Sequence, residues 1–138
     1  MKLWEAILAG SKLRPQTFGD FFQDHGSCAL GAALEIQYRS YDVRFLKKKD
    51  KYLTKIFPVL KKVVTCPHFS ECSGPIIAII PHLNDEYRWS REAIAEWVKV
   101  QEDRLEKDTE ANNIQKQLNL CLESEVNEKK EIETRVYV

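Results

Sequence analysis

The segment from Pro81 to Val98, PHLNDEYRWSREAIAEWV, gathers side chains that can do chemistry. An imidazole, an amide, a carboxylate and two guanidinium groups stand close together there, and they are the binding candidates: His82, Asn84, Asp85, Arg88 and Arg91. An imidazole beside a carboxylate is a pair that general acid–base catalysis uses. The same residue types also suit a junction between two helices, because Asn and Asp side chains close turns by bonding to nearby backbone. We therefore predict that this segment is a structural junction between two helices. His82 is the exception, because turn geometry does not require an imidazole at that position.

Trp89 and Ser90 predict where the helix after this junction begins. Ser90 is a favourable N-cap for REAIAEWVKVQEDRL, and Glu92 places negative charge in the first turn. Trp89 precedes the cap, where it can pack on Ile94 as a hydrophobic staple. The apolar positions of this helix share one predicted buried face, formed by Ile94, Trp97, Val98 and Leu105.

Two cysteines and two histidines are weak candidates for zinc ligands: Cys66, His68, Cys72 and His82. Structural zinc takes four thiolate or imidazole donors, usually as two closely spaced pairs. The C-x-H-x3-C spacing is not that of a zinc knuckle. We therefore predict free thiols, no bound metal and no cofactor.

Cys28 lies at the start of a short predicted helix, where the helix dipole can lower the pKa of a thiol. With His25 or His82 as its base it could act as a nucleophile, but its small apolar neighbours suit a buried thiol equally well. The chain has no Gly-rich phosphate loop, nucleophile elbow or paired-carboxylate signature. The sequence favours a non-enzymatic protein and leaves a thiol- or zinc-dependent one, using Cys28, Cys66, Cys72 and His82, as an alternative.

Positive charge gathers in the middle of the chain. Residues 1–62 hold 12 Lys and Arg against 6 Asp and Glu, and eight of these bases form a candidate basic patch: Arg44, Lys47, Lys48, Lys49, Lys51, Lys55, Lys61 and Lys62. Such a segment can contact phosphates. Charge blocks more often form a solvated face, however, and the formal net charge of the chain is zero. Nucleic acid is therefore an alternative partner and not the favoured one.

The elements that must position these residues are predicted to be mostly helices. Residues 2–9 place their apolar side chains on one helical face, and Gly10 is a natural stop. A loop over 13–27 follows, with Phe side chains as anchors, and Ser27 can cap a short helix over CALGAALEIQ. Gly31 in that helix costs about 1 kcal/mol relative to Ala, so we expect a packing reason for it.

The segment from Tyr41 to Val64 has helical spacing up to Val63, but Pro58 must kink or divide that helix. TCPHFSECSGP then forms a turn-rich connector. Periodicity alone cannot decide between helix and strand for IIAII at 76–80. We favour a helix there because its neighbours are helical, with a short strand as the alternative.

The chain has 138 residues, of which 43% are hydrophobic and 30% charged, and this suits one globular domain. We predict a mainly α fold, a small single-domain helical bundle with long ordered loops, a possible short strand pair and a C-terminal helix. The compact helical domain covers 1–101. No apolar run is long enough to span a membrane and the start does not resemble a signal peptide, so we expect a cytoplasmic protein with reduced cysteines and no membrane partner.

Residues 102–138 form a polar helical extension with 10 acidic and 6 basic residues. Its narrow apolar stripe, Ile114, Leu118, Cys121 and Leu122, is too short for a confident coiled coil. The extension can pack on the domain, pair with a second chain as a homodimer, or fray. We favour a docked or dimerising helix.

Several motifs occur together in this order: GSCALGAALE, a Cys-Pro turn, and HLNDEYRWSREAIAEWV. In this combination, residues 1–101 resemble a family of small uncharacterised bacterial and phage-associated proteins. The resemblance implies a shared fold and a bacterial or phage origin, and it implies no activity. Family members often carry Cys-Pro-x-Cys where this chain has Cys66, Pro67, His68 and Phe69, and the second cysteine is displaced to Cys72. The functional prediction is a small protein-interaction or regulatory module with an unknown protein partner, acting on a host protein if phage-associated.

Overall fold

The computed structural model describes residues 1–38 and 47–136, and its elements are helices with two short strand pairs. In chain order they are α1 (Leu3–Ser11), β1 (Phe22–Gln23), β2 (Gly26–Ser27), α2 (Ala29–Tyr38), α3 (Lys49–Ile56), the 3-10 turn η2 (Pro58–Lys61), β3 (Val63–Thr65), β4 (Ser73–Pro75), α4 (Ile76–Pro81), the π-helical turn η3 (His82–Glu86) and α5 (Arg91–Val136). The predicted mainly α fold, with a helix at the C-terminal end, is confirmed. Both strand pairs are antiparallel hairpins, β1 with β2 and β3 with β4.

The chain divides into two compact units, residues 1–102 and 103–138. The boundary lies one residue beyond the predicted one and falls inside α5. Among residues 1–38 and 47–126, the largest fully buried side chains all belong to the first unit: Leu3, Ile7, Leu30, Leu34, Leu53, Leu60, Ile76, Ile79, Ile80, Leu83, Ile94 and Val98. None of the helices in the described ranges is long and apolar enough to cross a membrane.

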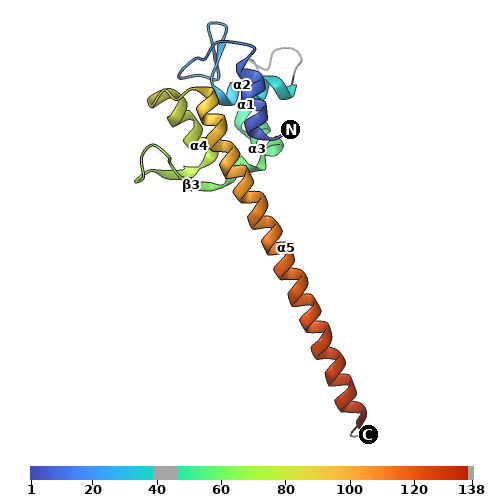
Figure 1. Cartoon of the computed structure of the whole chain (residues 1–138). Helices are drawn as coiled ribbons and strands as arrows, with labels where there is room; N and C mark the ends of the chain where they lie inside the picture. Colours follow the sequence, from blue (N-terminus) through green and yellow to red (C-terminus); the bar gives the residue numbers. More distant parts are fainter. Residues whose placement is uncertain (39–46, 137–138) are drawn as a thin grey trace. The chain divides into compact units, whose positions relative to one another are not determined.

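α1 and α2 lie side by side in the first unit (Figure 1). Gly10 belongs to this contact and does not end the helix, which continues to Ser11. A Cβ at Gly10 would overlap the backbone carbonyl group of Ala32, so only glycine permits this close approach. The expected packing reason for Gly31 is also present, because a Cβ there would overlap the carbonyl oxygen of Phe21.

Side chains distant in the sequence satisfy the helix starts in this unit. The Glu102 carboxylate accepts hydrogen bonds from the backbone N–H groups of Leu3 and Trp4, at 3.1 and 2.9 Å, at the start of α1. At the start of α2 the predicted cap Ser27 is wrong. Instead Cys28 Sγ accepts from the N–H of Gly31 and an Asn84 oxygen accepts from that of Ala29.

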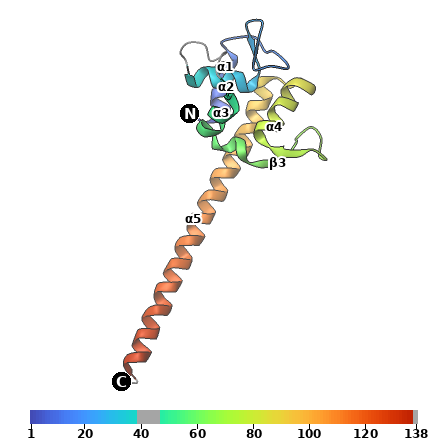
Figure 2. The ribbon, with the colours of Figure 1, turned by 180° about the vertical axis from the view of Figure 1, so that it is seen from behind.

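Pro58 divides the predicted helix over 41–64, as expected. α3 ends at Ile56, and Pro58 opens the 3-10 turn η2. Beyond it the helical prediction is wrong, because Val63 begins strand β3 and is exposed. α4 covers Ile76–Pro81, so the helix favoured for 76–80 is confirmed. The β3–β4 hairpin adjoins this helix (Figure 2).

Candidate functional site

Asn84 is the centre of the polar network at the predicted junction. Its side chain is only 1% exposed, and both of its polar atoms have partners. Oδ1 accepts hydrogen bonds from Gln16 Nε2 at 2.9 Å and from the N–H of Ala29 at 3.2 Å. Nδ2 donates to the carbonyl oxygen of Thr17 at 3.0 Å and to Asp85 Oδ1 at 2.7 Å. Asn84 therefore joins three segments distant in sequence, whereas the prediction had it closing a local turn.

Arg91 lies in the interior and is 5% exposed. Its Nη1 donates to the carbonyl oxygen and the hydroxyl of Ser27, and its Nη2 to the carbonyl oxygens of Ser11 and Arg14. Burial lowers the pKa of this guanidinium, and the Glu92 charge opposes that shift. The sequence nominated Arg91 for binding, but its donors hold the end of α1 and the start of α2, where a ligand from solvent does not reach them.

The other nominated residues have separate surroundings. His82 Nδ1 lies 3.2 Å from the carboxylate of Glu86, one turn later. Arg88 is exposed, has a left-handed backbone with φ of 51°, and places its guanidinium carbon 4.3 Å from the ring centroid of Phe18. Asp85 accepts from Asn84. These contacts give no shared set of polar atoms around one substrate position.

An aromatic cluster that the sequence did not predict surrounds His68. The His68 ring stacks on Tyr87 with centroids 3.8 Å apart, and its Nδ1 accepts a hydrogen bond from Trp89 Nε1 at 3.3 Å. His68 thus connects the turn of the β3–β4 hairpin to the residues just before α5. Ser90 caps α5 as predicted, by accepting from the N–H of Ala93 at 3.1 Å. The staple between Trp89 and Ile94 stays a prediction.

The cysteines lie in different environments. Cys28 is buried, and desolvation raises its pKa to about 11, so its thiol is protonated at neutral pH and is a poor nucleophile. Cys66 is buried, Cys72 is half-buried, and Cys121 on the extension is exposed. Among the described residues, no three His, Cys, Asp or Glu side chains converge in a way that could hold a metal ion.

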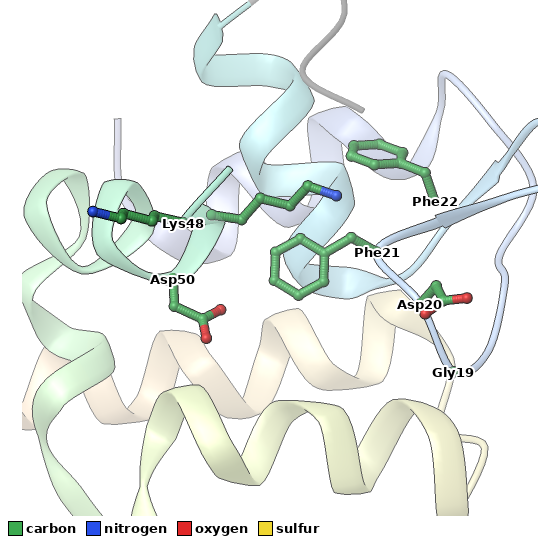
Figure 3. A pocket seen from close by; sticks show the side chains of 7 residues that line it. Gly19, Asp20, Phe21, Phe22, Lys48 and Asp50 are labelled. Carbon is green, nitrogen blue, oxygen red and sulfur yellow. The ribbon is translucent and has the colours of Figure 1, made fainter. Parts of the chain in front are cut away.

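The candidate basic patch includes one residue, Arg44, that lies outside the described residues. Five of its lysines are exposed and two, Lys49 and Lys62, are half-buried. Lys49 Nζ lies 5.5 Å from the ring centroids of both Phe21 and Phe22. Together with neighbouring residues these side chains line a cavity of about 490 Å³, whose lining is Gly19, Asp20, Phe21, Phe22, Lys48, Lys49 and Asp50. Figure 3 shows the loop that carries the phenyl rings facing the start of α3.

The second unit carries an exposed apolar stripe, Ile114, Leu118, Cys121 and Leu122. Successive members are three or four residues apart or adjacent, so they share one helix face. Each of the three aliphatic side chains is more than half exposed. Leu120 and Val126 are also more than half exposed, and Leu120 lies about 200° around the helix from Leu118.

No family model, no curated protein and no solved structure matches the chain. The family resemblance of residues 1–101 therefore stays a prediction. The function is argued below from geometry and surface chemistry.

Proposed function

We propose that the protein is a non-enzymatic protein-interaction module that pairs with a second copy of itself through the apolar stripe of its C-terminal extension. The exposure of Ile114, Leu118 and Leu122 on one helix face carries the proposal. In the first unit the largest fully buried side chains form a core, its exposed apolar side chains do not form a stripe along one helix, and Asn84 and Arg91 are committed to structural hydrogen bonds.

A second helix is the occupant that suits this stripe. An isolated helix gains little stability in water from propensity alone, and most helical stability in proteins comes from packing an apolar face. Burying a fully exposed Leu or Ile side chain contributes about 1.5–3 kcal/mol, and the aliphatic side chains of the stripe, which are 53–59% exposed, would each contribute roughly half of that. The face is narrow, which suits the seam of a two-helix pair more than the wide groove of a globular partner.

The charge pattern favours a second copy over a highly charged partner. Residues 111–122, ANNIQKQLNLCL, contain five amide side chains and one charged residue, Lys116. Two such segments can approach with like-charge repulsion limited to Lys116 of each copy, and amide side chains can bond to one another across the pair. A strongly charged partner would find only Lys116 as a charged group on this segment.

One pair of leucine substitutions tests the proposal. Leu118→Glu places a charge in the stripe, whereas Leu120→Glu places the same charge on the opposite face. The two leucines are 53% and 55% exposed, so the variants are matched in chemistry and in exposure. We expect light scattering after size exclusion to give a dimer for the wild type and Leu120→Glu, and a monomer for Leu118→Glu. A monomeric wild type, or equal behaviour of the two variants, would refute self-pairing through the stripe.

In its more general form, the proposal is that the stripe binds a partner protein other than a second copy of this chain. The family resemblance extends it to a regulatory contact between a phage-associated protein and a bacterial host protein. No described residue selects such a target. If the wild type is monomeric, a partner that binds the wild type and Leu120→Glu but not Leu118→Glu would replace the second copy as the occupant of the stripe.

The cavity at Phe21 and Lys49 supports nucleic-acid binding as a second candidate function. Phenyl rings can stack on bases while lysines contact phosphates, which is how many proteins bind single strands. We expect Lys48→Glu to weaken binding of a labelled single-stranded oligonucleotide and Lys61→Glu, at a lysine that does not line the cavity, to weaken it less. Binding should also fall steeply with added salt. Undetectable binding at low salt would exclude this function.

A further inference from the structure

The β3–β4 hairpin places Cys66 and Cys72 opposite each other. The paired residues are Val63 with Pro75, Val64 with Gly74 and Thr65 with Ser73. The next pair in this register is Cys66 with Cys72, and the N–H of Cys66 donates to the carbonyl oxygen of Cys72 at 2.8 Å. The N–H of Ile76 donates to the carbonyl oxygen of Lys62 at the other end of the ladder. Cys66 and Cys72 therefore face each other at the end of the ladder with one of the two hydrogen bonds of such a pair, because the N–H of Cys72 donates to the carbonyl oxygen of Phe69 at 3.0 Å.

We propose that Cys66 and Cys72 form a reversible intramolecular disulfide when the protein meets a peroxide or a small-molecule disulfide. Residues directly opposite on antiparallel strands have Cα atoms about 4.5–5.5 Å apart, and disulfides span about 4.4–6.8 Å. Residues directly opposite on paired strands point to the same face of a hairpin. The Tyr87 phenol agrees with this placement, because desolvation and the charges of Cys66, Glu86 and Cys72 raise its pKa.

The unequal exposure of the two thiols sets the order of the chemistry. Cys72 is half-buried, whereas Cys66 is 3% exposed. Hydrogen peroxide therefore reaches Cys72 first: the thiolate attacks one peroxide oxygen, the O–O bond breaks, and after proton uptake a sulfenic acid and water result. The Cys66 thiolate then attacks the Cys72 sulfur, the S–O bond breaks, and the hydroxide leaves as water after taking a proton. Two thiols and one peroxide give one disulfide and two waters.

This cross-link encloses His68. The five residues between the cysteines form the turn that carries His68, whose ring contacts Tyr87 and Trp89. A disulfide closes the base of that turn and restrains the contact between the hairpin and the residues before α5. Among the described side chains, these cysteines do not belong to a group of three residues that could hold a metal ion. A disulfide needs only the two thiols. This chemistry does not depend on pairing of the C-terminal extensions.

Thiol mapping across glutathione buffers tests the proposal on the full chain. The Cys121→Ser variant removes the exposed thiol, so that links between chains do not interfere. After equilibration, acid quenching, unfolding and alkylation, we expect Cys66 and Cys72 to lose alkylation together while Cys28 stays alkylated. Before alkylation, the intact mass should fall by the mass of two hydrogen atoms. The oxidised fraction should follow the ratio of glutathione disulfide to the square of reduced glutathione, as an intramolecular dithiol requires.

A second variant tests whether oxidation of Cys66 requires Cys72. Cys72→Ser on the same background should leave Cys66 reduced over the same range of buffers. A glutathione adduct on Cys72 as the final product, with a first-power dependence on reduced glutathione, would overturn the proposal. A disulfide between either residue and Cys28, or no oxidation of the pair in any buffer, would overturn it as well.

Discussion

At the scale of single residues, the polar side chains of the junction hold distant segments together. Asn84 accepts from the start of α2 and from Gln16, and Arg91 donates to carbonyl groups on both sides of the loop that follows α1. A buried polar group left without a partner costs about 1–3 kcal/mol. Asn84 and Arg91 therefore contribute more to the free energy of unfolding than a solvent-exposed helix cap does.

Asn84→Asp should destabilise the protein strongly at neutral pH. The substitution is nearly isosteric, but it removes the N–H groups that donate to Thr17 and Asp85 and puts a buried carboxylate beside the Asp85 carboxylate. We expect a loss of about 3 kcal/mol or more in the free energy of unfolding, against about 1 kcal/mol for Ser90→Ala. The loss should shrink as the pH falls and the new carboxyl is protonated. Urea unfolding at two pH values measures both effects, and equal stability of the two variants would refute this role for Asn84.

The Cys28 thiol should make the protein sensitive to alkali. Its pKa is about 11 in the folded state and near 9 in an exposed thiol, so between these values the unfolded chain ionises while the folded chain stays protonated. The contribution of the protonated Cys28 thiol to stability is therefore fully present below pH 9 and is lost as the pH rises toward 11. We expect Cys28→Ala to remove on the order of 2 kcal/mol of this pH dependence. Identical slopes of stability against pH for the two proteins would contradict the raised pKa.

At the scale of elements, predictions held where local chemistry decides and failed where a distant partner decides. Ser90 caps α5 through its own first turn, and Pro58 divides its helix because it lacks an N–H group. In the sequence, Gly10 is a local signal for the end of a helix, and Ser27 is a local signal for the N-cap of the next one. Their real roles depend on Ala32 and Arg91, which only the folded chain brings near. The candidate site was predictable to the same degree: the Ser90 cap was foreseen, and the His68 cluster was not.

Gly10→Ala should disrupt the packing of α1 on α2. Alanine favours a helix by up to about 1 kcal/mol over glycine, but its Cβ would overlap the backbone of Ala32. We expect a net loss of about 1–3 kcal/mol, as in other overpacked cores. Gly74→Ala is the control, because a Cβ there meets no atom within 4 Å. Thermal unfolding of both variants measures the difference, and a stabilised Gly10→Ala protein would show that the helices can separate without cost.

At the scale of the whole molecule, the apolar core and the exposed apolar stripe belong to different units. Among the side chains that the structure describes, the largest fully buried ones belong to residues 1–102, and the exposed stripe belongs to residues 103–138. A chain cut after Leu105 keeps the core complete and loses the stripe. We expect it to unfold cooperatively in urea as a monomer. A truncated chain that binds a hydrophobic dye and unfolds without cooperativity would show that the extension completes the core.

The central claim is that two copies of this chain pair through their extensions, and the molar mass in solution tests it most directly. One chain has a mass of 16.1 kDa. Sedimentation equilibrium of the full-length protein should give about twice that mass at high concentration and approach 16.1 kDa on dilution, with the chain cut after Leu105 at its own monomer mass throughout. A full-length protein that stays at 16.1 kDa at every concentration would contradict the account.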